Sequence, residues 1–332
     1  MGTNLVGIDI GECAVKLVQT SDGVIRKAAR AEVLDNMVAD GVITSMDAMA
    51  DFLKETAKEA GISGGPAAII LPDRLVVTRN ITLPIMTETQ LKYNLPFEFR
   101  DYLEDEKNRY FYDYAVREMV KDEEGQPSEV RLLACAVRKD TISEYRQMLK
   151  RAGFKLSVAV PRIYAYERYV ENADDFDDSP ETDDYCLVNI GHMSTFICFY
   201  HDREIVSSKV IDIGFGSIDR KYAEAEEIDI HVAHSYVINN YENVLESQLA
   251  LDVYNSIAVE VMKAVNFFNY NNRDASLSTL HMLGGGALIP QMLNTMADVT
   301  GYPIVSAGDG NKNAVKNIED SELYIEALAA TL

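Results

Sequence analysis

The chain has 332 residues, 47% of them hydrophobic and 25% charged, with a formal net charge of −22. This composition predicts a folded globular protein, long enough for two domains, and excludes extended disorder. The negative charge disfavours direct binding to nucleic acid or anionic lipid, and no apolar run reaches the about 18 residues that span a bilayer, so we expect a cytoplasmic chain without direct membrane insertion.

The first expected elements are three short strands. Between Leu5 and Val33, apolar runs are separated by Gly11 and by the sequence Ser21-Asp22-Gly23. Glycine-bearing turns between apolar runs are typical of antiparallel hairpins. The chain therefore opens with a predicted β-meander.

A helix is predicted next, because apolar residues between positions 46 and 60 follow helical spacing. Thr44 and Asp47 resemble a capping box at its start, and Gly61 is placed to end it. We expect this helix to cover one face of the meander.

Residues 81–160 have a pattern of their own. It predicts a helix over 88–102, strands over 110–118 and 130–137, a helix over 141–152 and a strand over 154–160. Asp140 is expected to cap the second helix and Gly153 to end it. The segment is rich in aromatic side chains, most of which we expect in its core: Tyr93, Phe97, Phe99, Tyr102, Tyr110, Phe111, Tyr112 and Tyr114. We interpret it as an inserted α+β subdomain.

A second meander begins at Cys186. A shift of 180 positions without a gap aligns it with the first, so that Asp9 falls on Asn189 and Gly11 on Gly191. One element used twice at this distance predicts two related lobes with a cleft between them. A broad apolar stripe between positions 253 and 268 predicts a long helix that is buried on most sides within the second lobe.

Three glycine-bearing turns are candidates for binding a phosphate chain. Two are the hairpin tips at Gly11 and Gly191, where backbone amides can approach a phosphate closely. The third is Gly284-Gly285-Gly286, which follows an apolar run and leads into a helix with Pro290 in its first turn. Each turn taken alone is more readily explained as an ordinary structural turn.

Taken in order, GIDIGECAVKLV, LVNIGHMSTFICF and HMLGGGALIPQM resemble the phosphate-1, phosphate-2 and adenosine motifs of the actin, Hsp70 and sugar kinase superfamily. The segments ITLPIMTETQLKYNLPFEFRDYL and VRKDTISEYRQMLKRAGFKLSVAVPRIYAYERY resemble the insertion of the PilM family. The resemblance implies an α/β, actin-like (ribonuclease H-like, duplicated) two-lobed fold. It places the first lobe at 1–80 and 161–185, the inserted α+β subdomain at 81–160 and the second lobe at 186–332.

The same resemblance implies a scaffold of a type IV pilus or type II secretion-like assembly machine on the cytoplasmic face of the inner membrane. It implies, as partners, other pilus assembly components and the N-terminal tail of a PilN-like membrane protein, docked between the first lobe and the insertion. It further implies ATP and Mg²⁺ in the cleft, with Asp9 facing Mg²⁺ through water. The nucleotide-binding positions carried over from the motifs are Asp9, Gly11, Lys16, Asn189, Gly191, Ser194, Thr195, Gly284, Gly285 and Gly286.

Several residues depart from the family motifs. Glu12 and Cys13 stand where small hydroxyl residues are usual, which brings a carboxylate towards the expected phosphates. Asn189 replaces the aspartate that orients Mg²⁺-bound water, and an amide can neither carry that charge nor act as a base. The adenosine-side Ala-Glu pair and lysine fall on Ala233, His234 and Val237. We therefore expect weak or lost ATP hydrolysis.

Two alternatives stay open on the sequence. A sugar or acetate kinase of the same superfamily would share the phosphate and adenosine turns, but it would need a catalytic aspartate early in the second lobe. A filament-forming protein like FtsA would share the fold, but the sequence ends in EALAATL without the basic amphipathic helix by which FtsA binds membranes.

A metal centre of the chain's own is not expected from the sequence. His231 and His234 would share one face of a helix, but no cysteine or carboxylate lies nearby at the spacing of a metal site. The cysteines are scattered rather than closely paired, and we expect them to be reduced: Cys13, Cys135, Cys186 and Cys198.

Overall fold

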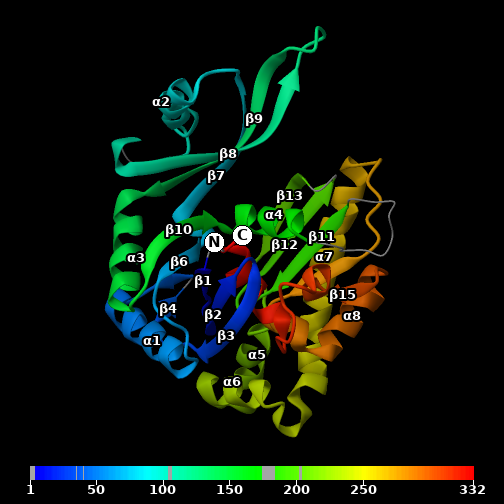
Figure 1. Cartoon of the computed structure of the whole chain (residues 1–332). Helices are drawn as coiled ribbons and strands as arrows, with labels where there is room; N and C mark the ends of the chain where they lie inside the picture. Colours follow the sequence, from blue (N-terminus) through cyan, green and yellow to red (C-terminus); the bar gives the residue numbers. More distant parts are fainter. Residues whose placement is uncertain (1–3, 35, 40, 104–106, 174–183, 202–203) are drawn as a thin grey trace.

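The computed structural model describes residues 4–34, 36–39, 41–103, 107–173, 184–201 and 204–332. Two five-stranded sheets form the centres of two lobes, and a three-stranded sheet stands apart from them (Figure 1). The first sheet has the order β10-β6-β1-β2-β3, with β1 (Asn4–Ile10), β2 (Ala14–Ser21), β3 (Val24–Glu32), β6 (Pro66–Leu71) and β10 (Lys155–Pro161). The second has the order β13-β12-β11-β14-β15, with β11 (Tyr185–Ile190), β12 (Thr195–His201), β13 (Glu204–Ile211), β14 (Leu280–Leu283) and β15 (Ile304–Ser306).

The expected duplication is confirmed, because the two sheets repeat one topology. In each lobe the first strand pairs antiparallel with the second and parallel with the fourth: β1 with β2 and β6, and β11 with β12 and β14. The turn between β2 and β3 has φ of 54° at Asp22 and 74° at Gly23. Positive φ at both central residues matches the twist of a tight hairpin and favours Asp-Gly. The equivalent turn at 202–203 lies outside the described residues.

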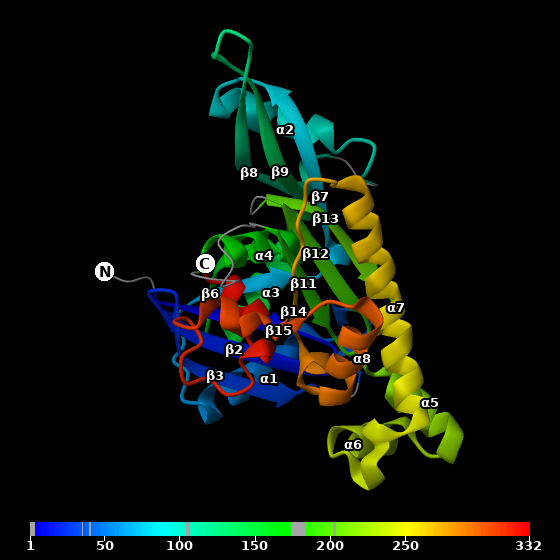
Figure 2. The ribbon, with the colours of Figure 1, turned by 90° about the vertical axis from the view of Figure 1, so that its right-hand side faces the viewer.

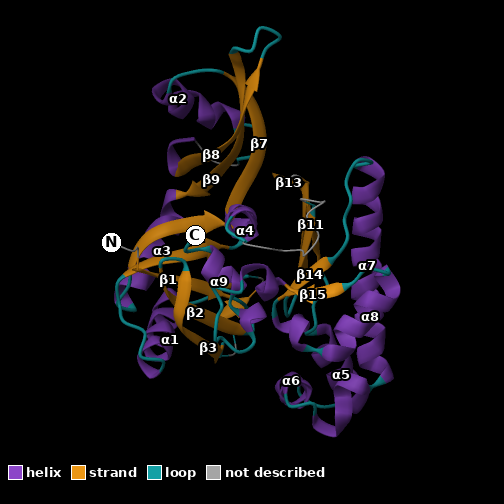
Figure 3. Cartoon of the chain, turned by 45° about the vertical axis from the view of Figure 1, so that its right-hand side comes forward, coloured by secondary structure: helices purple, strands orange, loops and turns teal. Residues whose placement is uncertain are grey.

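Two helices cover the outer face of the first sheet: α1 (Met46–Glu59) and α3 (Lys139–Arg151) (Figure 3). Their apolar faces pack with side chains of β1, β2 and β6 into one core cluster. The expected helix ends are confirmed at Gly61 and Gly153, which have φ of 62° and 93° just beyond the last turns.

The expected N-caps of these helices are wrong by one or two residues. Ser45 caps α1 by accepting a hydrogen bond from the Ala48 amide at 3.3 Å, whereas the Thr44 hydroxyl donates to the Asn36 carbonyl. Arg138 occupies the N-cap position of α3, and Asp140 lies inside the first turn. An acidic residue in the first turn still interacts favourably with the helix dipole, which explains why the sequence signal was similar.

The second lobe carries α5 (Ser217–Glu226), α6 (Ile230–Ile238), α7 (Gln248–Asn271) and α8 (Pro290–Thr300) (Figure 2). The long helix α7 was expected to be buried on most sides, and this is wrong. Only one face of it packs on the sheet, through residues such as Val253, Ile257 and Phe268, whereas Phe267 and Tyr270 are exposed. The helix therefore covers the outside of the lobe, with its predicted apolar stripe buried and its opposite side facing solvent.

The inserted unit is a sheet of order β7-β9-β8 with one helix: β7 (Val76–Pro84), β8 (Tyr110–Lys121), β9 (Pro127–Arg138) and α2 (Glu88–Glu98). Thr87 and Gln90 form a capping box at the start of α2, which ends at Glu98 rather than at the expected residue 102. The expected boundaries, 81 and 160, do not coincide with this sheet. Strand β7 begins before residue 81, and β10 pairs with β6, so that α3 and β10 complete the first lobe.

The end of the chain returns from the second lobe to the first. Helices α4 (Arg162–Glu171) and α9 (Ile325–Ala329) lie between the two sheets and share a core cluster with side chains of both (Figure 3). Strand β1 approaches α9 closely at Gly7, where an added Cβ would stand 1.8 Å from the Ala327 carbonyl oxygen. The expected second lobe, 186–332, thus contributes its last turns to the first lobe.

Short elements complete the described chain. They are β4 (Val38–Ala39), β5 (Val42–Ile43) and the 3₁₀ helices η1 (Asp73–Leu75), η2 (Lys107–Arg109), η3 (Tyr241–Glu246), η4 (Gly285–Leu288), η5 (Ala307–Asn311) and η6 (Ser321–Leu323).

Candidate functional site

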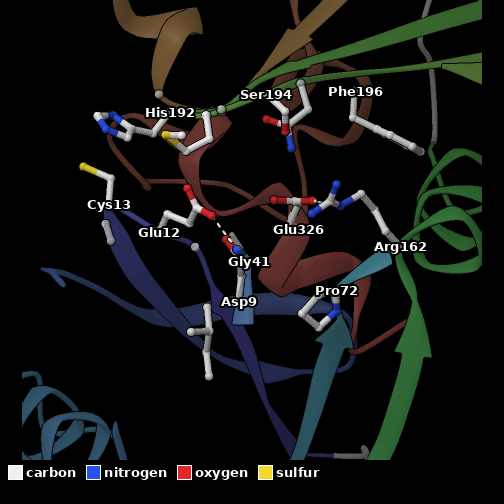
Figure 4. A pocket seen from close by; sticks show the side chains of 18 of the residues that line it. Asp9, Glu12, Cys13, Gly41, Pro72, Arg162, His192, Ser194, Phe196 and Glu326 are labelled. Atoms are coloured by element: carbon white, nitrogen blue, oxygen red, sulfur yellow. Dashed lines mark hydrogen bonds and ion pairs between the residues drawn. The ribbon is translucent and has the colours of Figure 1, made fainter. Parts of the chain in front are cut away.

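The three glycine-bearing turns converge on one cleft between the lobes, as the sequence predicted. The cleft has a volume of about 630 Å³, within the usual range for small-molecule sites (Figure 4). Of the positions carried over from the motifs, those that line it are Asp9, Gly11, Lys16, Asn189, Gly191, Ser194, Gly284 and Gly285. Residues separated by almost the whole chain thus meet in one place.

Two of the predicted positions do not line the cleft. Thr195 is fully buried, and its hydroxyl donates to the Ile213 carbonyl at 2.8 Å. Gly286 packs under the cleft, where an added Cβ would stand 2.3 Å from the Ile190 side chain. Both residues are packed behind the turns that line the cleft, and surrounding atoms separate them from the cleft itself.

The glycine amides of the turns are engaged within the protein. Gly11 and Gly191 donate across their own turns to Ala14 and Ser194, at 3.1 and 2.9 Å, and Gly284 donates to the Glu322 carbonyl at 3.1 Å. The amides of these three glycines already have acceptors, so they are not available to a phosphate. The glycines instead permit tight turns and leave room at the cleft wall.

An ion pair lies near the tip of the first hairpin. The Lys16 ammonium donates to the Asp9 carboxylate at 2.9 Å, and both side chains are largely buried. Burial alone would lower the pKa of Lys16, but the charges of Asp9 and Glu326 more than offset it, and the pKa lies above its ordinary value. Lys16 therefore stays charged and holds the carboxylate that the motif directs towards Mg²⁺.

Asn189 belongs to a hydrogen-bonded network of polar side chains that joins the lobes. Its Nδ2 donates to the Tyr166 hydroxyl at 2.9 Å, and this hydroxyl donates to Glu326 Oε1 at 2.9 Å. Arg162 completes the network with Nε 2.9 Å from the same Glu326 oxygen and Nη1 donating to Asp73 at 2.8 Å (Figure 4). The amide at position 189 is thus used as a donor to the first lobe.

Burial shifts the pKa values of the groups in this hydrogen-bonded network. Burial holds the pKa of Tyr166 well above its ordinary value, and Glu326 adds to the effect, so the hydroxyl keeps its proton. Burial also raises the pKa of Glu326, against the effect of Arg162. Sequence reasoning missed Arg162, Tyr166 and Glu326, because they lie on α4 and α9, outside the phosphate and adenosine motifs.

The Glu12 side chain is held at the wall of the cleft. Its carboxylate accepts a hydrogen bond from the Gly41 amide at the wall of the cleft (Figure 4). A negative charge is therefore fixed near the first turn, next to the position expected for phosphates.

A second cluster lies at the rim of the cleft. Cys13 Sγ is 3.5 Å from His234 Nε2, although the two residues are 221 positions apart. His234 Nδ1 is 2.6 Å from Asp219 Oδ2, and His192 Nε2 is 3.6 Å from the same oxygen. Local spacing, on which the sequence argument rested, could not reveal a cluster drawn from separate segments of the chain.

The two histidines of the cluster are shifted in pKa by their surroundings. The hydrogen bond to Asp219 raises the pKa of His234 to about 10, with a further contribution from Cys13. Burial lowers the pKa of His192, whose ring packs against Phe215 at 5.1 Å and against the backbone of Gly216. An added Cβ at Gly216 would stand 2.4 Å from this ring, so a side chain there would force the His192 ring to move.

The aromatic residues of the insertion divide into a core and a surface. Phe99 and Tyr110 are buried, and Tyr112 and Tyr114 are partly buried. The others are exposed: Tyr93 by 73%, Phe97 by 48%, Tyr102 by 55% and Phe111 by 45%. Only half of the set lies in the core, so the expectation that most of these side chains are buried there is wrong.

The chain matches known proteins over nearly all of its length. A family model described as "Type IV pilus assembly protein PilM" matches residues 7–329. Among solved structures, the chain is similar to a PilM-PilN type IV pilus biogenesis complex, with 19% identity, a TM-score of 0.78, and 99% of this chain and 97% of that chain covered.

Two further structures are similar to the chain. The ethanolamine utilization protein EutJ from Carboxydothermus hydrogenoformans is 13% identical with a TM-score of 0.60, covering 98% of this chain and 88% of that one. MreB 5 of Spiroplasma citri bound to AMPPNP is 13% identical with a TM-score of 0.50, covering 96% and 95%. At these identities the likenesses establish the actin-like fold. Among the described residues, no helix combines the length and apolar character needed to cross a membrane.

Proposed function

The chain belongs to the PilM family of type IV pilus assembly proteins, and on this premise we propose that it is an actin-like scaffold that holds the tail of a PilN-like membrane protein. The observation that carries the proposal is the family match over residues 7–329, supported by the likeness to a PilM-PilN complex. It favours this function over the sugar or acetate kinase and FtsA-like alternatives. The scaffold would lie at the cytoplasmic face of the inner membrane, held there by its partner.

The docking surface we propose is the exposed aromatic face of the insertion. Tyr93 and Phe97 form an aromatic pair on α2 with ring centroids 6.0 Å apart. Cations stack on neighbouring rings: Lys107 lies 4.3 Å from the centre of the Phe97 ring and Arg79 lies 4.1 Å from that of Tyr102. Exposed rings offer a large contact area at a low cost in side-chain entropy, which suits capture of an extended peptide.

A peptide titration tests this docking site. The N-terminal tail of the PilN-like protein from the same organism should bind the full chain with a micromolar Kd, because ordering the tail offsets much of the contact energy. The double variant Tyr93→Ala/Phe97→Ala should weaken binding about tenfold or more. Point variants are a sharper test than a deletion of the predicted insertion, residues 81–160. That deletion would also remove α3 and β10 from the first lobe.

The matched control is Tyr241→Ala, which removes an exposed aromatic ring from η3 in the second lobe. It should leave the Kd unchanged. If the double variant binds as wild type does, the insertion is not the docking site. If no tail binds at all, the scaffold proposal itself fails.

We further propose that the cleft binds a nucleotide without efficient hydrolysis. Its size and glycine turns fit a nucleotide, and ATP would lie among the three turns. The residues for Mg²⁺ fit less well, because Asp9 is already paired with Lys16 and the Asn189 amide donates to Tyr166. Mg²⁺, when bound, would neutralise phosphate charge, and Asp9 would hold it through water.

Nucleotide binding and phosphate release test this second proposal separately. A fluorescent ATP analogue should bind, while phosphate release stays close to the background rate. Turnover that Asn189→Ala abolishes would contradict the proposal, since it would give Asn189 a role in hydrolysis. The docking experiment does not depend on this result.

A further inference from the structure

The cluster at the rim of the cleft has the composition of a metal site. Cys13, His192 and His234 each offer one ligand atom, and these atoms all lie within 4.8 Å of one another. Figure 4 shows the Cys13 sulfur next to the His192 ring, at the opening of the cleft. Thiolate and imidazole are the ligands that zinc prefers in proteins.

The distances suit a tetrahedral ion. With Zn–S of about 2.3 Å and Zn–N of about 2.0–2.1 Å, a tetrahedral angle separates sulfur from nitrogen by about 3.6 Å. The observed separation between Cys13 Sγ and His234 Nε2 is 3.5 Å. No separation in the cluster is larger than 4.8 Å, so the excess over this value is at most about 1.2 Å, which a small rotation of an imidazole ring on the partly exposed His192 or His234 can close.

Asp219 provides the support that zinc-binding histidines usually have. Ligating imidazoles commonly donate their second N–H to a carboxylate, which fixes the tautomer and leaves the other nitrogen free for the metal. His234 faces Asp219 with Nδ1 at 2.6 Å and Cys13 with Nε2, the arrangement this requires. Asp219 is 2% exposed and is positioned by the first turn of α5.

Two buried polar atoms of the cluster are unsatisfied within the described part of the chain. Asp219 Oδ1 and His192 Nδ1 are both buried and have no hydrogen-bond partner there. Such atoms are costly without a partner, and they often mark the place of an ion or water. This observation is independent of the spacing of the three ligand atoms.

We propose that Cys13, His192 and His234 form a zinc site that bridges the two lobes. Zn²⁺ takes the thiolate and one nitrogen of each imidazole, and binding releases to solvent the protons that Cys13 and His234 carry on the ligating atoms. Three protein ligands leave a fourth position for water. Asp219 is a positioning residue that orients the histidines.

The site couples metal binding to the arrangement of the lobes. Cys13 lies at the tip of the first hairpin, whereas His192 and His234 belong to the second lobe. An ion held by all three therefore links the two sides of the cleft. The proposal does not depend on the nucleotide or on the PilN-like partner.

The same contacts also resemble a Cys-His-Asp triad, in which His234 would activate the Cys13 thiol. A triad gives no role to His192, although its Nε2 lies 3.6 Å from the shared carboxylate oxygen and its Nδ1 is buried and unsatisfied. The zinc site uses all of these groups, and the experiment below separates the two.

Zinc affinity is measured on the metal-free full chain by competition with a chromophoric chelator. Asp219→Asn should lower the affinity about 10- to 100-fold, and Cys13→Ser, His192→Ala and His234→Ala should lower it further. The matched controls Cys135→Ser and His231→Ala change the same residue types elsewhere and should keep the wild-type affinity. Equal affinity in wild type and Cys13→Ser would overturn the site, because carboxylates on the acidic surface would then explain the binding.

Three readouts keep the test decisive if a histidine variant fails to fold. Co²⁺ should give a thiolate-to-metal charge-transfer band in wild type that Cys13→Ser lacks, with folding of this turn variant checked by circular dichroism. Stoichiometric Zn²⁺ should slow alkylation of Cys13 but not of Cys135, and should raise the Tm of wild type but not of Cys13→Ser. Fast alkylation of Cys13 that Zn²⁺ does not slow would indicate a triad and would also overturn the proposal.

Discussion

The two hairpins that flank the cleft share a backbone but differ at matched positions. In the first, Asp9 stands opposite Lys16, and in the second, shifted by 180 positions, Asn189 stands opposite Phe196. Both turns are closed by a glycine amide that donates to the third residue after it. The first hairpin thus carries a buried ion pair where the second carries a neutral amide and an aromatic ring.

This difference teaches which features the fold requires and which it leaves free. Strand pairing and the turn hydrogen bond fix the backbone in both lobes, so the side chains at the tips can differ without changing the architecture. In the second hairpin, Asn189 reaches Tyr166 of the first lobe, and Phe196 lies under the guanidinium of Arg162 at 5.3 Å. The neutral pair Asn189 and Phe196 therefore contacts the first lobe, and the charge beside it belongs to Arg162.

The largest effect on stability is expected at Gly7, the glycine in the first strand of the first hairpin. Gly7→Ala places a Cβ 1.8 Å from the Ala327 carbonyl oxygen, so α9 must shift, and we expect a loss of about 3 kcal/mol in the free energy of unfolding. The matched position in the second hairpin is Leu187, which is fully buried in the core between the lobes. Leu187→Ala should cost about as much, through a cavity. Chemical denaturation measures both.

Gly65→Ala is the control for the glycine substitution, because an added Cβ there meets nothing within 4 Å. Its effect should stay within about 0.5 kcal/mol. If Gly7→Ala is as mild as this control, the packing of α9 on β1 is not as close as described.

The next effect comes from breaking the ion pair of the first hairpin. Lys16→Met leaves the Asp9 carboxylate without its cation in a largely buried place, and we expect a loss of about 2 kcal/mol, between the values for buried and surface pairs. The double variant Asp9→Asn/Lys16→Met gives the first hairpin an uncharged pair like that of the second, and it should recover at least half of the loss. A double variant less stable than Lys16→Met would show that the hairpin depends on the charges themselves.

Much of the fold could be predicted from the sequence because it depends on local patterns. The Asp22-Gly23 turn, the helix ends at Gly61 and Gly153, and the repeat of the meander all follow from short-range chemistry. The bounds of the insertion could not be predicted. Whether residues 155–161 pair with β6 or with the inserted sheet depends on contacts that no local pattern records.

The site could be predicted only in part, for the same reason. The motifs predicted the three turns that line the cleft, but several of the polar side chains in and beside it come from other elements. Tyr166 and Glu326 arrive on α4 and α9, and His234 meets Cys13 across 221 positions. Such meetings follow from the tertiary fold, so only the structure reveals them.

A smaller effect is expected from giving the second hairpin the charge of the first. The Tyr166 hydroxyl has one proton, which it donates to Glu326, so Asn189→Asp would set a second acceptor against it. We expect a loss of about 1.5 kcal/mol in the free energy of unfolding and no gain in phosphate release. Met193→Ala, at the exposed tip of the same hairpin, is the control and should change stability by less than about 0.5 kcal/mol. ATP turnover that appears with Asn189→Asp would show that this amide alone blocks hydrolysis.

The smallest effect tests whether the two turns are equivalent. Neither Gly11 nor Gly191 has a positive φ, so alanine is allowed at both by the backbone. An added Cβ would stand 3.1 Å from the Ala14 carbonyl oxygen in the first turn and 2.9 Å from that of Ser194 in the second, the same oxygens that accept the turn-closing hydrogen bonds. Because the strain falls on the same bond, Gly11→Ala and Gly191→Ala should each cost about 1 kcal/mol and agree within about 0.5 kcal/mol in chemical denaturation. A neutral substitution in one turn beside a costly one in the other would mean that the duplication extends to the strands but not to the turns.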